Sequence, residues 1–118
     1  MLEKMYEISM LYDFYGELLT PRQKSIMQYY YEENYSLGEI ADETGVSRQA
    51  VYDAVRKAEK SLHSYEDKLG LVKRFIQTES DIEKAEGVID EIIHQYRDDE
   101  VIVEKLTSVK NILGKLEE

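Results

Sequence analysis

The stretch SLGEIADETGVSRQAVYDAVRKAEKS, residues 36–61, contains two helical patterns separated by a very short turn. Apolar residues recur at helical spacing in both patterns, at Leu37, Ile40 and Ala41 in the first and at Val51, Ala54, Val55 and Ala58 in the second. Between them, Gly45 can adopt the positive φ that ends a helix, and Ser47 can cap the next helix. These features predict a helix-turn-helix, in which the second helix is built to enter a major groove.

The charge of the chain is distributed unevenly around this motif. The formal net charge is −10, which is awkward for a nucleic-acid binder because attraction to phosphates supplies much of the affinity. Residues 1–19 carry one basic and four acidic side chains, a net charge of −3. Residues 20–63 carry six basic and seven acidic side chains (−1), and residues 64–118 carry eight basic and fourteen acidic side chains (−6). Residues 47–61 alone carry +2, from Arg48, Arg56, Lys57 and Lys60 against Asp53 and Glu59. The predicted second helix is therefore a basic island in an acidic protein, which permits DNA binding.

Two further helices are predicted ahead of the motif. Residues 2–18 repeat apolar side chains at helical spacing, at Met5, Ile8, Leu11, Tyr15 and Leu18. Thr20 is the expected N-cap of the next helix, with Pro21 at its first position and Gln23 completing a capping box. We expect that helix to run to about Glu32, with Asn34 and Ser36 supplying a turn and a new cap. Its candidates for burial are Ile26, Met27, Tyr30 and Tyr31.

Tyr29, Tyr30 and Tyr31 are consecutive in a chain that has ten tyrosines, two phenylalanines and no tryptophan. Three consecutive residues of a helix cannot all point inward, so we expect one or two of them in the core and the third at its edge. The alternative is an aromatic platform on which single-stranded bases stack. Such grooves interleave basic residues with the aromatic ones, and this segment has none.

The second half of the chain continues the helical pattern. One seam of apolar residues, at spacings of three and four, consists of Leu62, Tyr65, Leu69, Val72 and Ile76, and Gly70 interrupts it. Two later stripes follow, Ile82, Ala85, Ile89, Ile92 and Tyr96 in one and Ile102, Leu106, Val109, Leu113 and Leu116 in the other. We expect helix starts at Thr78 or Ser80 and at Asp98–Asp99. No useful strand-period pattern occurs, so the predicted fold class is all-α.

These patterns divide the chain into two parts. Residues 1–62 form the helix-turn-helix domain with its N-terminal helix, and residues 63–118 form a helical extension. The extension could fold as a hairpin onto the first part, or its seams could pair with another copy. We favour self-association, a homo-oligomer, because symmetric dimers read two half-sites of an operator.

Little in the sequence indicates catalysis. His63 and His94 are the only histidines, and the acidic residues 98–100 suit a helix start better than a metal site. The chain has no cysteine, no glycine-rich phosphate loop and no nucleophile elbow. We therefore expect no enzyme, no cofactor and no metal. No apolar run is long enough to span a membrane and the N-terminus does not have the pattern of a signal peptide, so a cytoplasmic location is expected.

The run LTPRQKSIMQYYYEENYSLGEIADETGVSRQAVYDAVRKAEKSL, residues 19–62, resembles region 4 of bacterial primary-type sigma factors. That family typically has a Leu-Thr-Pro-Arg opening, a Ser-Leu-x-Glu-Ile-Ala unit and a Gly-Val-Ser-Arg turn. These motifs occur here in the same order, at residues 19–22, 36–41 and 45–48. However, no region for melting or reading a −10 element precedes Leu19, and an acidic helical segment follows.

The whole layout, with the opening LEKMYEISMLYDFYGELLTPRQ at residues 2–23, is similar to the YlxM family of small bacterial DNA-binding helix-turn-helix proteins. This resemblance spans nearly the full chain. Genes of that family usually lie beside genes of the signal recognition particle GTPases. The resemblance therefore implies DNA binding and, from the gene neighbourhood, a regulatory part in that targeting pathway.

Carried over onto this sequence, the motif assigns the exposed face of the second helix to Ser47, Arg48, Gln49, Tyr52, Asp53 and Arg56. Arg48 and Gln49 would reach base edges, since Arg pairs with guanine and Gln with adenine. Ser47 and the helix N-terminus could hold a phosphate. Further candidate backbone contacts are Arg56, Lys57 and Lys60.

Some nearby residues oppose this assignment. Asp53 could accept a hydrogen bond from cytosine, but its carboxylate repels nearby phosphates. Three more acidic residues lie on the supporting helix: Glu39, Asp42 and Glu43. The alternative for all these charged residues is a solvated helix face with i, i+4 pairs.

Two functional hypotheses follow. In the first, the protein is a regulator that docks residues 47–61 on duplex DNA, or on the structured RNA of the signal recognition particle. In the second, it is a protein-interaction adaptor of that particle without specific DNA binding. The intact turn and the basic island favour the first hypothesis, and the acidic surroundings and long apolar seams favour the second.

Overall fold

The computed structural model describes residues 2–117, and within this range it is all-α, as predicted. The elements in chain order are α1 (Leu2–Tyr15), the 3₁₀ turn η1 (Gly16–Leu18), α2 (Pro21–Met27), the π-helical turn η2 (Gln28–Glu32), α3 (Leu37–Thr44), α4 (Arg48–Leu69), α5 (Leu71–Gln95) and α6 (Glu100–Leu116). Backbone contacts divide the chain into a first unit at residues 1–72 and a second at residues 73–118. The predicted boundary after residue 62 falls inside α4, and the functional division that it implies stays a prediction.

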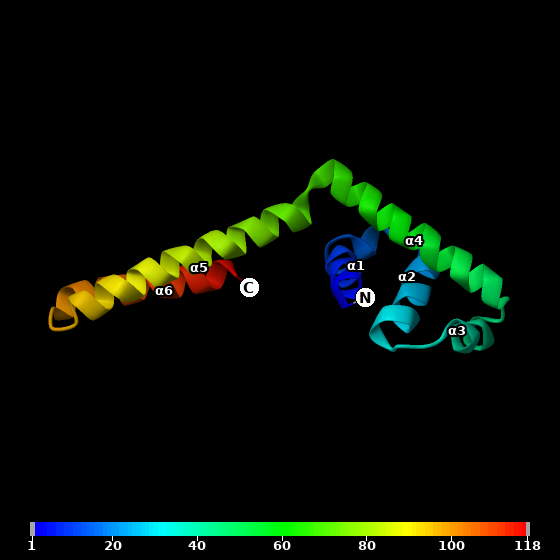
Figure 1. Ribbon diagram of the computed structural model, residues 1–118, viewed down its shortest axis with the longest axis horizontal. Coiled ribbons are helices and arrows are strands. Elements are labelled where there is room, and N and C mark those ends of the chain that lie inside the picture. The colour runs from blue at the N-terminus through cyan, green and yellow to red at the C-terminus, as the bar shows by residue number, and fades with distance from the viewer. Residues whose placement is uncertain (1, 118) are drawn as a thin grey trace. The chain divides into compact units, whose positions relative to one another are not determined.

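The first unit is organised around α4, which contacts α1, α2 and α3 (Figure 1). Each of these helices buries one apolar stripe against it, which removes apolar surface from water. The buried residues are Ile8, Leu11, Tyr15, Leu19, Ile26, Met27, Ile40, Val51, Val55, Ala58, Leu62 and Val72. The core therefore lies under the middle of α4 and leaves the opposite face of that helix to solvent.

The predicted caps are confirmed. Thr20 and Ser36 each accept a hydrogen bond from the backbone N–H three residues later, and Gln23 and Glu39 return the bond to complete both capping boxes. Gly45 has φ +72° and ends α3. Each such cap stabilises a helix by about 1 kcal/mol. Local sequence therefore determines where α2 and α3 begin and where α3 ends.

The stripe predicted over residues 2–18 is wrong at both of its ends. Met5 is 46% exposed and Leu18 is 55% exposed, whereas the three stripe residues between them are buried. The α-helix ends at Tyr15, and the 3₁₀ turn that follows advances the chain further per residue. This change of pitch rotates Leu18 out of phase with the stripe.

The tyrosine run also differs from the prediction. The helix that was expected to continue to Glu32 changes at Gln28 into a π-helical turn, in which the N–H of Glu33 bonds the carbonyl of Gln28 at 3.1 Å. Tyr29, Tyr30 and Tyr31 are all half-buried, and none is in the core. The wide turn rotates the chain less per residue than an α-helix does, so three consecutive rings share the edge of the core.

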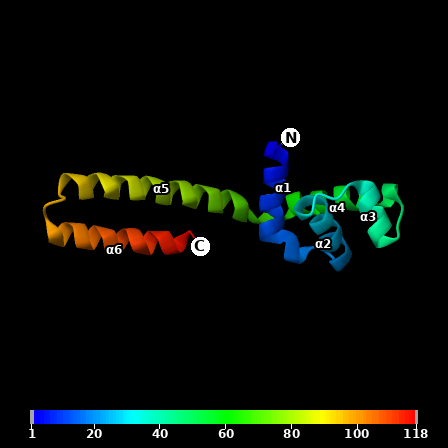
Figure 2. The same cartoon turned by 90° about the horizontal axis from the view of Figure 1, so that it is seen from below.

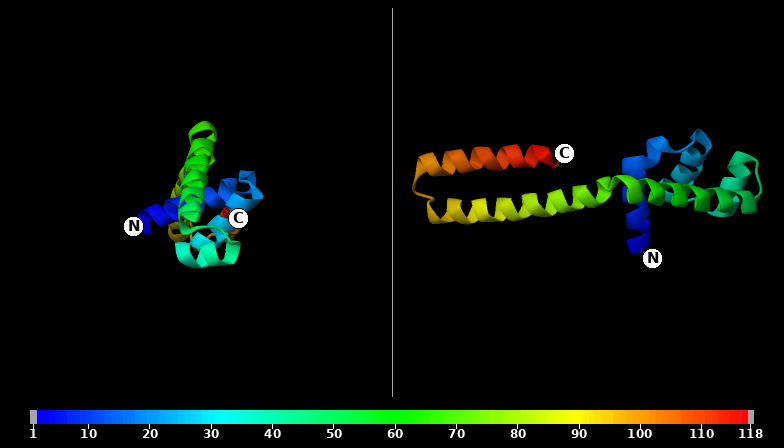
Figure 3. Two further views of the ribbon diagram at one scale, coloured as in Figure 1. Left: turned by 90° about the vertical axis from the view of Figure 1, so that its right-hand side faces the viewer. Right: turned by 90° about the horizontal axis from the view of Figure 1, so that it is seen from above.

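The second unit is an antiparallel helical hairpin of α5 and α6, which lie side by side in Figures 2 and 3. Lys110 donates a hydrogen bond to Asp90 across it at 2.7 Å, and Asp99 caps α6 as predicted. The helix start predicted at Thr78 or Ser80 is wrong, because α5 is continuous from residue 71. The seam that was predicted across Gly70 is also interrupted: Leu69 and Ile76 are exposed. Gly70, with φ +63°, ends α4 and changes the helical phase there.

Candidate nucleic-acid interface

The N-terminal turn of α4 is built by its own cap. Ser47 precedes the helix in an extended conformation, and its hydroxyl oxygen accepts a hydrogen bond from the N–H of Ala50 at 3.1 Å. Arg48 and Gln49 follow as the first two residues of the helix, and both are exposed. The turn therefore presents two long polar side chains at the positive end of the helix dipole.

The polar face of α4 lies opposite the buried face. The apolar residues Val51, Val55 and Ala58 are buried, and the predicted contact residues between and beside them are exposed. These exposed residues are Ser47, Arg48, Gln49, Tyr52, Arg56, Lys57 and Lys60. The amphipathic pattern thus places all seven at the surface; whether they contact nucleic acid stays a prediction.

Neighbouring turns of this face are linked by side-chain contacts. The amide nitrogen of Gln49 donates to Oδ1 of Asp53 at 3.0 Å. The guanidinium of Arg56 lies over the ring of Tyr52, 5.8 Å from its centre, and donates to the Tyr52 hydroxyl at 3.3 Å. Gln49 must therefore release Asp53 before its amide can donate to a base.

Lys4 joins the basic side chains of α4 across the fold. It lies on α1 and lines one surface hollow together with Arg56, Lys57, Lys60 and His63, and the carboxylates of Asp53 and Glu59 line the same hollow. Residues more than fifty positions apart in sequence are brought together here because α1 packs against α4. Lys4 was not among the contact residues predicted from the sequence, because a single lysine in an acidic helix gives no local signal of such a role.

The acidic residues of α3 form the opposing part of the site. Asp42 and Glu43 are exposed, and Glu39 is exposed but also accepts from the backbone N–H of Ser36 at 3.1 Å. Leu37 of the same helix shares a shallow hollow with Arg48, Gln49 and Tyr52. Leu37 thus places one apolar side chain beside the beginning of α4. Glu39 lies in the same first turn of α3 as Leu37, and Asp42 and Glu43 lie toward its other end.

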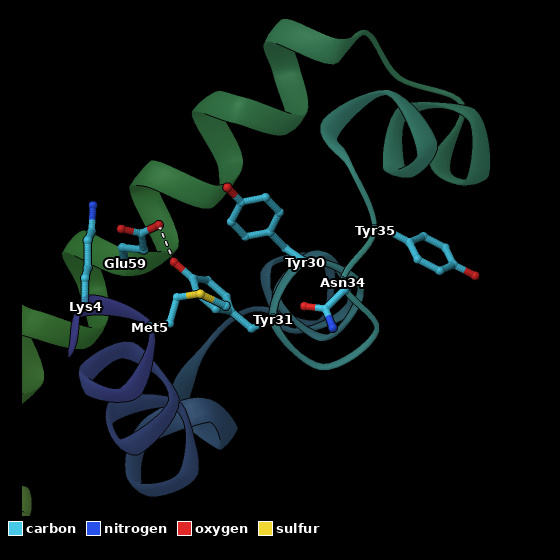
Figure 4. A pocket seen from close by; sticks show the side chains of 7 residues that line it. All are labelled: Lys4, Met5, Tyr30, Tyr31, Asn34, Tyr35 and Glu59. Carbon is cyan, nitrogen blue, oxygen red and sulfur yellow. Dashed lines mark hydrogen bonds between the residues drawn. The ribbon is translucent and has the colours of Figure 1, made fainter. Parts of the chain in front are cut away.

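A second group of polar side chains lies at the edge of the core beside η2 (Figure 4). The hydroxyl of Tyr31 donates to Oε1 of Glu59 at 2.9 Å, and the rings of Tyr30 and Tyr31 meet edge to face at 5.0 Å. Burial raises the pKa of the Tyr31 hydroxyl, and the hydrogen bond to the Glu59 carboxylate raises it further. This hydroxyl therefore keeps its proton and holds the Glu59 side chain in place.

Two features of residues 2–117 bear on other functions. No group of three or more histidine, cysteine or carboxylate side chains has the spacing of a metal site within that range. None of the helices described there is both long and apolar enough to cross a membrane.

Comparison with known proteins identifies the family. A family model described as "Putative helix-turn-helix protein, YlxM / p13 like" matches residues 2–109. A UPF0122 protein of Listeria innocua is 43% identical over 112 residues, which is 95% of this chain and 99% of the relative. A UPF0122 protein of Geobacillus kaustophilus is 49% identical over 89 residues, covering 75% and 81% of the two chains. A third, from a Thermoanaerobacter species, is 42% identical over 111 residues, or 94% and 92%. The chain therefore belongs to the UPF0122 family of helix-turn-helix proteins.

Proposed function

We propose that this protein is a DNA-binding regulator that docks the recognition segment, residues 47–61 of the Ser47 cap and α4, in the major groove of duplex DNA. The observation that carries the proposal is that every cation of this segment is exposed on the face of α4 that is turned away from the core. The resemblance to sigma factor region 4 supports the same helix as the one that enters the groove.

Each contact residue has a distinct role in this proposal. Arg48 at the first turn pairs with the acceptors of guanine, and Gln49 pairs with adenine once it leaves Asp53. Tyr52 lies one turn further on and carries Arg56 over its ring. The phosphates are bound by Ser47 and by the cations further along, Arg56, Lys57, Lys60 and Lys4 of α1.

The dependence of DNA affinity on salt tests this proposal. Four cations that each neutralise one phosphate give a slope of log affinity against log salt of about −3.6. The measurement is fluorescence anisotropy with the full chain and a pool of labelled genomic fragments at several salt concentrations. A regulator shows binding with a slope of a few units, and absence of binding at low salt contradicts the proposal.

Self-association is the second part of the proposal. The α6 helix exposes four apolar side chains along one line, Val101, Val109, Ile112 and Leu116. Ile112 and Leu116 are 57% and 63% exposed, and water-exposed apolar rows of this kind mark protein contacts. A second copy of the same hairpin supplies a matching row, and the resulting dimer presents two recognition segments to a symmetric operator.

The alternative function is an adaptor of the signal recognition particle that contacts the RNA or a protein of the particle. The acidic carboxylates of α3 favour it, because they lie where the supporting helix of a DNA-binding motif normally crosses the phosphate backbone. The purified particle RNA and the purified particle protein are titrated with the chain at the same salt concentration as the DNA pool. Tighter binding to either component than to duplex DNA supports the adaptor and contradicts the regulator.

A further inference from the structure

The shallow hollow beside the first turn of α4 is lined by Leu37, Arg48, Gln49 and Tyr52. Leu37 is half-buried and Tyr52 is 43% exposed, so both keep apolar surface in contact with water here. In the proposed function, Arg48 and Gln49 contact base edges, and the apolar surface between them and Leu37 has no assigned role. The hollow therefore adds an apolar element to the place where bases would be read.

Tyr52 lies on the same side of α4 as the two base-contact residues. It follows Arg48 by four positions and Gln49 by three, spacings that make side chains neighbours on one helix face. Long side chains of a helix lean toward its N-terminus, so the Tyr52 ring covers the turn that carries Arg48 and Gln49. The guanidinium of Arg56 lies 5.8 Å from the ring centre and donates to the hydroxyl. These contacts restrain the ring as one wall of the hollow.

Leu37 forms the wall on the side of α3. It is the first residue of that helix, and the preceding Ser36 caps it by accepting a hydrogen bond from the N–H of Glu39 at 3.1 Å. Part of the Leu37 side chain packs against the core, and α3 packs on α4. The fold therefore fixes the position of this leucine beside Arg48 and Gln49.

The thymine C5-methyl group is the apolar group that base pairs present in the major groove. An apolar hollow favours this methyl group, because burial removes it from water. Cytosine has a hydrogen atom at the same position and would leave the hollow partly unfilled. A purine would instead present its N7 acceptor, and Leu37 has no hydrogen-bond donor to offer it.

We propose that this hollow binds the C5-methyl group of a thymine in the DNA site, with Leu37 and Tyr52 as the residues that read it. The thymine lies within two base pairs of the guanine that Arg48 contacts, because Arg48 lines the same hollow. This inference rests on the proposed docking of the recognition segment in the major groove. It adds Leu37, a residue of the supporting helix, to those that determine specificity.

The test removes the methyl group from the DNA and leaves the protein intact. The full chain selects its tightest duplex from a random pool, and each thymine of that duplex is replaced singly by deoxyuridine, which keeps every hydrogen-bonding atom. One replacement, within two base pairs of the guanine at which Arg48→Ala loses its preference, should weaken binding by about fourfold, the effect of one buried methyl group. Competition anisotropy measures the ratio of the thymine and uracil affinities.

Three variants connect this ratio to the hollow. Leu37→Ala and Tyr52→Ala, each with its helical circular dichroism intact, should bring the ratio close to one. Tyr52 is exposed, so its variant keeps the test valid if Leu37→Ala is destabilised. Lys60→Ala is the matched control, because a lost phosphate contact should weaken binding to both duplexes by the same factor and keep the ratio at about four.

The outcomes separate this inference from the proposed function. Absence of binding to every duplex at low salt contradicts both. Binding without a uracil effect near that guanine overturns the methyl site alone. If Leu37→Ala weakens binding to the thymine and uracil duplexes equally, the hollow packs on the sugar–phosphate backbone, and the methyl site is overturned as well.

Discussion

Gly45 acts at the scale of one residue, through its backbone conformation and not through burial. It has φ +72°, and an added Cβ would meet no atom within 4 Å. The cost of another side chain at this position is therefore conformational and not steric crowding. L-residues avoid the left-handed region by about 1–2 kcal/mol, and β-branched residues avoid it most strongly.

Gly45→Val should therefore lower the free energy of unfolding by about 1–2 kcal/mol, measured by denaturant titration followed by circular dichroism. Gly45→Asn is the matched control, because asparagine tolerates this region, and it should lose less stability. A valine variant as stable as the wild type would show that the turn does not need the left-handed conformation in solution.

Arg48 and Lys57 allow base contacts to be distinguished from phosphate contacts. Arg48→Ala should reduce the preference for the best DNA site by about 1–3 kcal/mol while non-specific binding persists. Lys57→Ala should weaken binding to all sequences alike and reduce the salt slope by about 1. Competition anisotropy with specific and random duplexes measures both effects. If both variants bound every duplex as the wild type does, this face of α4 would not be the DNA interface.

At the scale of the elements, the junction of α4 and α5 depends on two buried or half-buried side chains. Tyr15, 1% exposed, donates its hydroxyl to Glu66 at 2.6 Å and accepts from the N–H of Leu71 at 3.0 Å. The same Glu66 oxygen accepts from the N–H of Val72 at 3.0 Å. The first N–H groups of a helix have no partner within the helix, so Tyr15 and Glu66 cap α5 from α1 and α4.

Tyr15→Phe should lower the melting temperature by about 5–10 °C, because it removes the acceptor of the Leu71 N–H and one of the hydrogen bonds to the Glu66 carboxylate. Differential scanning calorimetry measures this change. Phe14→Leu is a control for general loss of aromatic packing at the end of α1. An unchanged melting temperature for Tyr15→Phe would show that water replaces the hydroxyl at the junction.

The raised pKa values of two tyrosine hydroxyls determine how the stability of the fold should change with pH. Burial raises the pKa of Tyr15, with a further contribution from Glu66, and burial and Glu59 raise that of Tyr31. An unfolded tyrosine loses its proton near pH 10. The folded state retains these protons to higher pH, so their contribution is complete below pH 10 and is lost as the pH rises beyond it.

Denaturant unfolding from pH 8 to pH 11 should therefore show constant stability followed by a decline. The double variant Tyr15→Phe, Tyr31→Phe should be less stable at pH 8 and should decline less steeply above pH 10. A decline of the same steepness in both proteins would assign the effect to other groups.

At the scale of the whole molecule, the two units differ in how much of their apolar surface is buried. The first unit encloses a core from α1 to the start of α5. Among the described residues after 72, Ile82 alone is buried, and both helices of the hairpin retain exposed apolar side chains. Helices in water are stabilised mainly by packing of an amphipathic face, so the hairpin gains most from a further partner.

Ile112→Glu should convert the proposed dimer into a monomer, because it places a charge in the exposed row of α6. Light scattering during size exclusion should give twice the 13.9 kDa chain mass for the wild type and the single mass for the variant. Thr107→Glu adds the same charge to α6 outside that row and should stay dimeric. A monomeric wild type at micromolar concentration would contradict self-association.

The local sequence was sufficient for the caps, the turn and the amphipathic pattern of α4. Thr20, Ser36, Ser47 and Gly45 act within four residues of chain, so their roles follow from the sequence alone. The exposed face of the recognition segment follows from the 3.6-residue period in the same way. For this reason the helix-turn-helix and its solvent-facing residues were predicted by residue number.

Only the tertiary structure decided where distant side chains meet. Lys4 lines the same hollow as the cations of α4, Tyr31 bonds Glu59, and Tyr15 with Glu66 caps α5, each across a sequence separation that carries no periodic signal. The change of pitch at Leu18 and the π-helical turn at Gln28 also depend on how the chain closes over the core. The hydrogen bonds of a cap, and the helix face on which a residue lies, depend on residues within one turn of the chain. Contacts between helices depend on the packing of all the elements at once.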